Sequence, residues 1–255
     1  MIQLPGEPKI VSRKENRAVL EISPLYPGYG TTIGNTLRRV LISSLEGAAV
    51  TAAKIKGVDH EFSSIPGVLE DVVEIIFNLK KIRFKLFKDE PVTLTLDVKG
   101  AREVVAADIK VTSDVEIVNP SQRIATITDK KVELSMEITI EKGIGYVPVE
   151  QRHKDKLSVG EIAIDGIFTP IRNVNFTVEN IRVGQRTDYN KVLLDIETDG
   201  SVSPEETLVR AADILIEHFS GIKKIAGNTS TSEPDTSIES VEAEKEKKPK
   251  KKKKE

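Results

Sequence analysis

The alternation of apolar and polar positions predicts β-strands along most of the first 200 residues. Nine segments show period-two alternation or a high share of β-branched residues, which is the pattern of half-buried strands. They are residues 16–23, 49–56, 82–87, 92–98, 114–118, 123–128, 132–140, 171–183 and 191–197. Only three segments have the helical period, so the pattern predicts an α+β fold with mostly antiparallel sheets.

The first predicted helix, about residues 31–45, has an apolar face and a charged face. Leu37 and Leu41 lie on the apolar face, whereas Arg38 and Arg39 project away from it. A solvated charged face is one interpretation of the two arginines. A face that docks a partner is the other, because Arg is enriched among the residues that dominate protein interfaces.

The second predicted helix spans about residues 68–81, with Glu70 and Asp71 in its first turn, where the helix dipole favours acids. The third begins with a capping box at Ser203–Glu206 and is expected to end near Gly221. Its apolar residues alternate steps of four and three, the spacing of a helix-on-helix seam. The seam residues are Leu208, Ala212, Leu215, Phe219 and Ile222. The first helix, a second copy of the chain, or both could cover this seam.

The composition removes several classes of chemistry. None of the 255 residues is Cys or Trp, so disulfides, thiolate zinc sites and cysteine nucleophiles are excluded. The histidines, His60, His153 and His218, lie far apart in the sequence, which leaves little material for a metal cage or a Ser-His-Asp relay. No secretory leader pattern and no apolar run of about 20 residues occurs. A soluble, cytoplasmic protein with no membrane partner is expected.

Charge is distributed unevenly along the chain. The last fifteen residues hold eight Lys and four acids, whereas residues 1–228 hold 30 bases and 33 acids. Residues 229–255 are expected to be disordered, since Ile238 and Val241 are their only core-forming side chains. Two interpretations of this Lys-rich tail stay open: it keeps the protein soluble, or it contacts DNA phosphates in a manner that salt would weaken.

A glycine-rich stretch, Tyr26–Asn35, precedes the first helix and raises the question of a phosphate cradle. Its glycines fit neither the dinucleotide fingerprint nor the P-loop, which needs a Lys after its last Gly. Pro24 and Pro27 also interrupt any strand that would lead into it. The stretch is therefore interpreted as a tight turn between a strand and a helix.

Four long stretches resemble the alpha subunits of bacterial-type DNA-directed RNA polymerase. They are Gly28–Val50 (GYGTTIGNTLRRVLISSLEGAAV), Gly57–Lys80, Lys142–Arg152 and Val183–Leu215. The resemblance covers nearly all of residues 1–228 and implies a two-part fold. Residues 1–46 and 175–228 would form a discontinuous dimerisation subdomain, with a second, mostly antiparallel-β subdomain at 47–174 inserted.

The resemblance also implies a function, which is the non-catalytic assembly of the polymerase. Two copies would pair and collect the large beta and beta-prime subunits, and the catalytic Mg²⁺ would be held by beta-prime, with no cofactor in this chain. Matching positions for the beta contact are Arg38, Arg39, Ile42 and Lys80; for the beta-prime contact they are Ile164, Arg186, Thr187 and Asp188. The implied dimer interface consists of Leu37, Leu41, Leu208, Ala212, Leu215 and Phe219.

The resemblance weakens at the C-terminus. Most family members continue into a small helical domain that binds upstream promoter DNA, whereas this sequence ends in the Lys-rich tail, so promoter contact is expected only through that tail. Two other functions stay open: a small hydrolase or transferase using His153 or His218, and a basic-tailed nucleic-acid-binding protein that works alone. Converging His, carboxylate and hydroxyl side chains would favour the first, and an extended basic surface the second.

Overall fold

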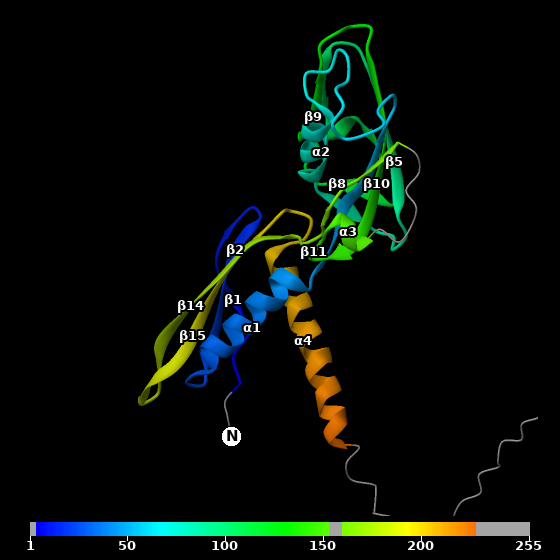
Figure 1. Cartoon of the computed structure of the whole chain (residues 1–255). Coiled ribbons are helices and arrows are strands. Elements are labelled where there is room, and N and C mark those ends of the chain that lie inside the picture. The colour runs from blue at the N-terminus through cyan, green and yellow to red at the C-terminus, as the bar shows by residue number, and fades with distance from the viewer. Residues whose placement is uncertain (1–3, 153–159, 228–255) are drawn as a thin grey trace, which may run out of the picture. The chain divides into compact units, whose positions relative to one another are not determined.

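The computed structural model describes residues 4–152 and 160–227, with side chains up to residue 224. The chain divides within its last helix into two compact units, the first ending at Ile216 and the second beginning at Glu217. Figure 1 shows helices and strands interspersed along the chain, and the strand pairs are antiparallel. The α+β class predicted from the sequence pattern is therefore confirmed.

A four-stranded sheet joins segments from both ends of the first unit. Its strand order is β1-β2-β15-β14. The strands are β1 (Lys9–Lys14), β2 (Arg17–Leu25), β15 (Arg186–Thr198) and β14 (Ile171–Val183). Leu20 on β2 lies opposite Leu194 on β15, so strands distant in the sequence share one apolar face. Alternating residues of β15 on that face, including Val192 and Ile196, are fully buried.

Helix α1 (Tyr29–Ser43) covers this face and packs against β14 and β15. Leu37 and Leu41 are buried in the core that it forms with the sheet. Two glycines let the helix approach closely: a Cβ at Gly34 would lie 2.5 Å from the Phe176 ring, and one at Gly30 would lie 2.7 Å from Val178 Cγ1. A side chain at either position would therefore require its neighbours to move.

A seven-stranded sheet carries a second, larger core. Its main strand order is β7-β5-β10-β3-β4-β8, with β12 also pairing with β3. The strands are β3 (Glu46–Ile55), β4 (Phe84–Leu86), β5 (Val92–Lys99), β7 (Ile109–Lys110), β8 (Val115–Ile117), β10 (Glu133–Ile144) and β12 (Glu161–Ala163). Shorter elements are β6 (Arg102–Val105), η1 (Ala106–Asp108), β9 (Arg123–Ile127), β11 (Tyr146–Val147), α3 (Val149–Arg152) and β13 (Gly166–Ile167). Fully buried residues such as Leu96, Ile138 and Ile140 belong to this core.

Helix α2 (Val72–Lys80) packs against β9 and β3 and begins later than the expected residue 68. Asp71 is its N-cap, and its carboxylate accepts a hydrogen bond of 2.7 Å from the Glu74 N–H. Glu70 lies before the helix and is buried, where its carboxylate accepts hydrogen bonds from the Thr126 N–H and hydroxyl. Placing Glu70 and Asp71 in the first helical turn was therefore wrong: Asp71 caps the helix from the position before it, and Glu70 binds Thr126 on β9.

Helix α4 (Pro204–Gly227) is longer than the sequence suggested, since it continues through Gly221. The expected C-cap at Gly221 is wrong: that glycine lies inside the helix. At the N-terminus the Ser203 hydroxyl accepts from the Glu206 N–H, as a capping box requires. The Glu206 carboxylate, in contrast, accepts a hydrogen bond from Arg210 one turn later.

Candidate interaction surfaces

The N-terminus of α1 is closed by the side chain of Asn190. Its amide oxygen accepts hydrogen bonds from the Gly28 N–H (2.9 Å) and the Gly30 N–H (3.3 Å), and its amide nitrogen donates to Asn180. Gly28 adopts a left-handed φ of 86°, which suits glycine. The helix-start donors that a phosphate would need are occupied from within the chain, which agrees with a tight turn and not with a nucleotide site.

The outer face of α1 presents Arg38, Arg39 and Ile42 to solvent. Ile42 is 46 % exposed, although it directly follows the buried Leu41. Neither arginine forms an ion pair within the described part of the chain. Two guanidinium groups beside an exposed aliphatic side chain make a surface able to bind carboxylates and apolar groups together.

One face of α4 is apolar and exposed. Phe219 and Ile222 are each about three-fifths exposed, as is Ile216. Leu208 and Leu215 pack partly against the smaller core, and Ala212 is half-buried. The first residues of the predicted seam are therefore partly packed within the chain, whereas Phe219 and Ile222 at its end are exposed.

Lys80 ends α2 and forms an ion pair of 2.9 Å with Asp165. This hydrogen bond, with a second from the Val149 N–H, lowers the pKa of the Asp165 carboxyl. The Lys80 ammonium also lies over the exposed ring of Phe77. Ile164, next to Asp165, is buried in the larger core, so its side chain is not part of the described surface.

The end of the β14–β15 hairpin is built around Arg186. Its guanidinium binds both carboxylate oxygens of Asp188 and lies over the rings of Tyr26 and Tyr189. The hydrogen bond with Asp188 raises the pKa of Arg186 and lowers that of Asp188. Arg186, Thr187 and Asp188 are exposed, so the three predicted positions form one ordered, polar corner. Neither tyrosine was anticipated, because nothing in the sequence indicates that residue 26 meets residue 189.

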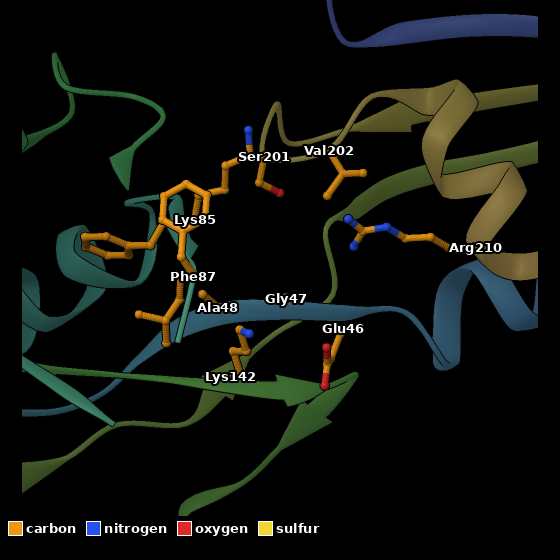
Figure 2. A pocket seen from close by; sticks show the side chains of 11 residues that line it. Glu46, Gly47, Ala48, Lys85, Phe87, Lys142, Ser201, Val202 and Arg210 are labelled. Atoms are coloured by element: carbon orange, nitrogen blue, oxygen red, sulfur yellow. The ribbon is translucent and has the colours of Figure 1, made fainter. Parts of the chain in front are cut away.

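A further feature that the sequence did not indicate is a pocket of about 390 Å³, which we call the cationic pocket. Figure 2 shows its side chains around an open space, coming from β3, β4, β10, the loop before α4, and α4 itself. The lining residues are Glu46, Gly47, Ala48, Phe84, Lys85, Leu86, Phe87, Lys142, Ser201, Val202 and Arg210. Three cations and one carboxylate therefore surround a partly apolar floor.

The two histidines that the structure describes have different surroundings. His60 is hydrogen-bonded to Ser63, three residues on, and His218 is exposed on α4. His153 lies outside the described residues, as does the Lys-rich tail. Among the residues that the structure describes, no three His, Cys, Asp or Glu side chains gather as metal ligands. Within the same residues, no helix is long and apolar enough to span a membrane.

Known proteins resemble the chain over most of its length. A family model described as RNA polymerase Rpb3/RpoA insert domain matches residues 53–169. A curated DNA-directed RNA polymerase subunit alpha from Roseiflexus sp. (strain RS-1) is 48 % identical over 90 % of this chain and 70 % of its own length. Subunits of the same name from Moorella thermoacetica (52 % identical; 81 % of this chain, 65 % of the relative) and Flavobacterium psychrophilum (46 %; 85 % and 66 %) are also similar. The chain thus spans about two thirds of the length of these relatives.

Proposed function

Because the chain belongs to the family of DNA-directed RNA polymerase alpha subunits, we propose that it is the non-catalytic subunit on which the polymerase assembles. In this role it pairs with a second copy and recruits the beta and beta-prime subunits. The observation that carries the proposal is the 48 % identity over 229 residues, which extends through both sheets and α4. A family match restricted to residues 53–169 would have supported the larger sheet alone.

Pairing is supported by the apolar side chains on α4. Side chains such as Phe219 and Ile222 are costly to leave in water, and a second copy of the helix would cover them. Leu37 and Leu41, the α1 residues proposed for the interface, are already buried against the chain's own sheet. Their contribution to pairing would therefore be indirect, through the position of α1.

Recruitment of beta is proposed for the outer face of α1 and for Lys80. Arg38, Arg39 and Ile42 are exposed, and the two guanidinium groups are available for carboxylates of a partner. Lys80 is less available, since it is paired with Asp165. We therefore assign most of the binding free energy to Arg39 and its neighbours.

Recruitment of beta-prime is proposed for the Arg186–Asp188 corner and the neighbourhood of Ile164. The rigid Arg186 corner suits a preorganised contact, because little side-chain entropy remains to be lost. Lys80 is assigned to the beta contact, whereas its ion-pair partner Asp165 lies next to Ile164 of the beta-prime contact. The two copies of a dimer resolve this, since each copy can present the same surface to a different large subunit.

The two apolar cores support the proposed division into a discontinuous subdomain, 1–46 with 175–228, and an inserted one, 47–174, except that Ile171 and Val174 belong to the smaller core. We also propose that this chain supplies no catalytic group, so that the beta-prime subunit holds the Mg²⁺ of nucleotide addition. The complex would act in the cytoplasm on the nucleoid. Contact of the Lys-rich tail with promoter DNA stays a prediction.

Co-purification tests the proposal. The tagged full chain, expressed in cells that make the polymerase, is expected to bring down two very large subunits in a 2:1:1 ratio. Recovery of the chain alone, or with nucleic acid only, would contradict the assembly role. Hydrolase or transferase activity of the isolated dimer would point to the alternative enzyme class.

A further inference from the structure

We propose that the cationic pocket is a docking site for an acidic protein segment that carries one apolar anchor side chain. The inference rests on the proposed function, because the segment would belong to another subunit of the same polymerase. It assigns a contact to residues that differ from those already discussed, which are Arg38, Arg39 and Ile42 on α1, Lys80 with Asp165, and Arg186–Asp188.

The charges of the pocket favour an acidic occupant. Lys85 is exposed and forms no ion pair among the described residues. Lys142 is bound at 2.6 Å by Asp89, whose side chain is 96 % exposed, so solvent competes for this carboxylate. Among the ion pairs of the described residues, Arg210 takes part in one, with Glu206 one turn earlier on α4. Carboxylates of a partner can replace both exposed acids, because exposed ion pairs contribute little to stability.

The floor of the pocket favours an apolar anchor. Phe84 is buried beneath it, whereas Phe87 is 62 % exposed at its edge. Figure 2 shows Lys85 and Phe87 on one side of the open space, and Arg210 reaching toward it from α4. An aromatic or aliphatic side chain inserted here would cover Phe87 and exclude water around the cations, which strengthens their attraction to carboxylates.

A protein segment fits this chemistry better than a nucleic acid does. Glu46 lies in the lining and would repel a phosphate and a carboxylate alike, so the distinction rests on what surrounds the pocket. The chain up to residue 228 also holds more acids than bases, a composition that disfavours an extended basic surface able to follow a phosphate backbone. One exposed aromatic ring gives room for a single anchor and not for a series of stacked bases.

A peptide probe tests the site in the isolated full chain. The probe is a fluorescein-labelled Gly-Asp-Glu-Phe-Asp-Glu-Gly peptide, followed by anisotropy at low salt. Lys85→Glu is expected to weaken its binding by about tenfold, since one attraction becomes a repulsion. Lys131→Glu, the same change at an exposed lysine outside the pocket, serves as the matched control. A probe with Ser in place of Phe should also bind less tightly.

Three results would overturn the inference: equal probe affinity of the Lys85→Glu and Lys131→Glu variants, absence of probe binding to the unaltered chain, or Lys85-dependent binding of oligothymidine in place of the peptide.

A photo-crosslinking amino acid at position 87, introduced into the reconstituted polymerase, then identifies the segment. A crosslink mapped to an acidic stretch of another subunit supports the proposal, and an efficiently assembled polymerase without one contradicts it. If the large subunits do not bind the chain but the probe result holds, the assembly role fails while the pocket remains a site for acidic segments.

Discussion

Asn190 shows how a single buried amide positions a helix that carries the candidate contact residues. It is only 8 % exposed, and its oxygen accepts from two backbone donors at the start of α1. The same side chain donates to Asn180 on the neighbouring strand. The orientation of α1, and with it the direction of Arg38 and Arg39, thus depends on a residue about 150 positions later.

Asn190→Ala is expected to lower the free energy of unfolding by about 1–3 kcal/mol, because two N–H groups lose their acceptor. Asn190→Asp keeps an acceptor and adds a negative charge at a helix N-terminus, so it should cost less. Urea denaturation of both variants measures the difference. Equal losses would show that the amide acts by its volume and not by its hydrogen bonds.

Arg39→Ala is expected to leave folding intact and to abolish capture of beta. Losing one partner of a desolvated charge pair costs about 2–5 kcal/mol, a factor of roughly 30 or more in affinity. Arg172→Ala is the matched control, since Arg172 is exposed on β14 and forms no ion pair among the described residues. Pull-down of beta measures the effect, and a normal yield of polymerase from the Arg39 variant would refute the assignment.

The Lys80–Asp165 pair is expected to make stability depend on pH at acid values. Lys80 lowers the pKa of Asp165 in the folded chain. The pair therefore stabilises the fold above the ordinary Asp pKa of about 3.9 and loses that contribution as the pH falls through the lowered pKa. Because both side chains are partly exposed, we expect about 0.5–1 kcal/mol. Asp165→Asn should make the free energy of unfolding depend less on pH in this acid range. An unchanged dependence would mean that other carboxylates cause it.

The contact of α1 with β14 explains, at the level of elements, why the turn sequence is rich in glycine. Gly30 and Gly34 lie four residues apart, one helical turn, and both face the sheet. Gly221 in α4 provides the opposite case, since a Cβ there would have no described atom within 4 Å. The same residue type thus has a packing role in one helix and none in the other.

Gly34→Ala is expected to destabilise the chain by about 1–3 kcal/mol, because the new methyl group must displace Phe176. Gly221→Ala should instead stabilise it by about 0.5–1 kcal/mol, since alanine favours the helix and meets nothing. Thermal unfolding followed by circular dichroism compares the two. A neutral Gly34 variant would mean that α1 can move away from the sheet at little cost.

At the scale of the whole molecule, the exposed face of α4 decides whether the chain is stable alone. Its apolar residues and its polar residues Asp213, Glu217 and Lys224 lie on opposite sides of the helix at 3.6 residues per turn. A helix with one uncovered apolar face is typical of an obligate partner interface.

Phe219→Asp is therefore expected to yield monomer or aggregate, because pairing would bury a carboxylate without a partner. Leu215→Asp should do the same, with an added loss of stability, since Leu215 also packs on the smaller core. Lys224→Asp, on the opposite side of the helix, should leave the dimer unchanged. Sedimentation velocity distinguishes the species, and unaltered dimers for both substitutions of the apolar face would exclude this interface.

Sequence periodicity by itself determined most of the regular structure. The strand predicted at 171–183 coincides with β14, and α1 and α4 lie within a few residues of their expected starts. Such elements are predictable because burial of one face imposes a local period of 2 or 3.6 residues. Strand β1 was missed for the same reason: all six of its residues are exposed, so it has no buried face and no pattern. The long stretches that resemble the family likewise needed no structure.

Only the tertiary structure decided which distant side chains meet. It made the second helix begin later than expected, where Glu70 binds Thr126, placed Arg186 against Tyr26, and set Asn190 at the start of α1. It also gathered Lys85, Lys142 and Arg210 around one pocket and buried Ile164, which the family resemblance had placed at a contact. These contacts join residues 50 or more positions apart, and their free energies depend on distances that the folding of two sheets creates, so no local pattern of residues records them.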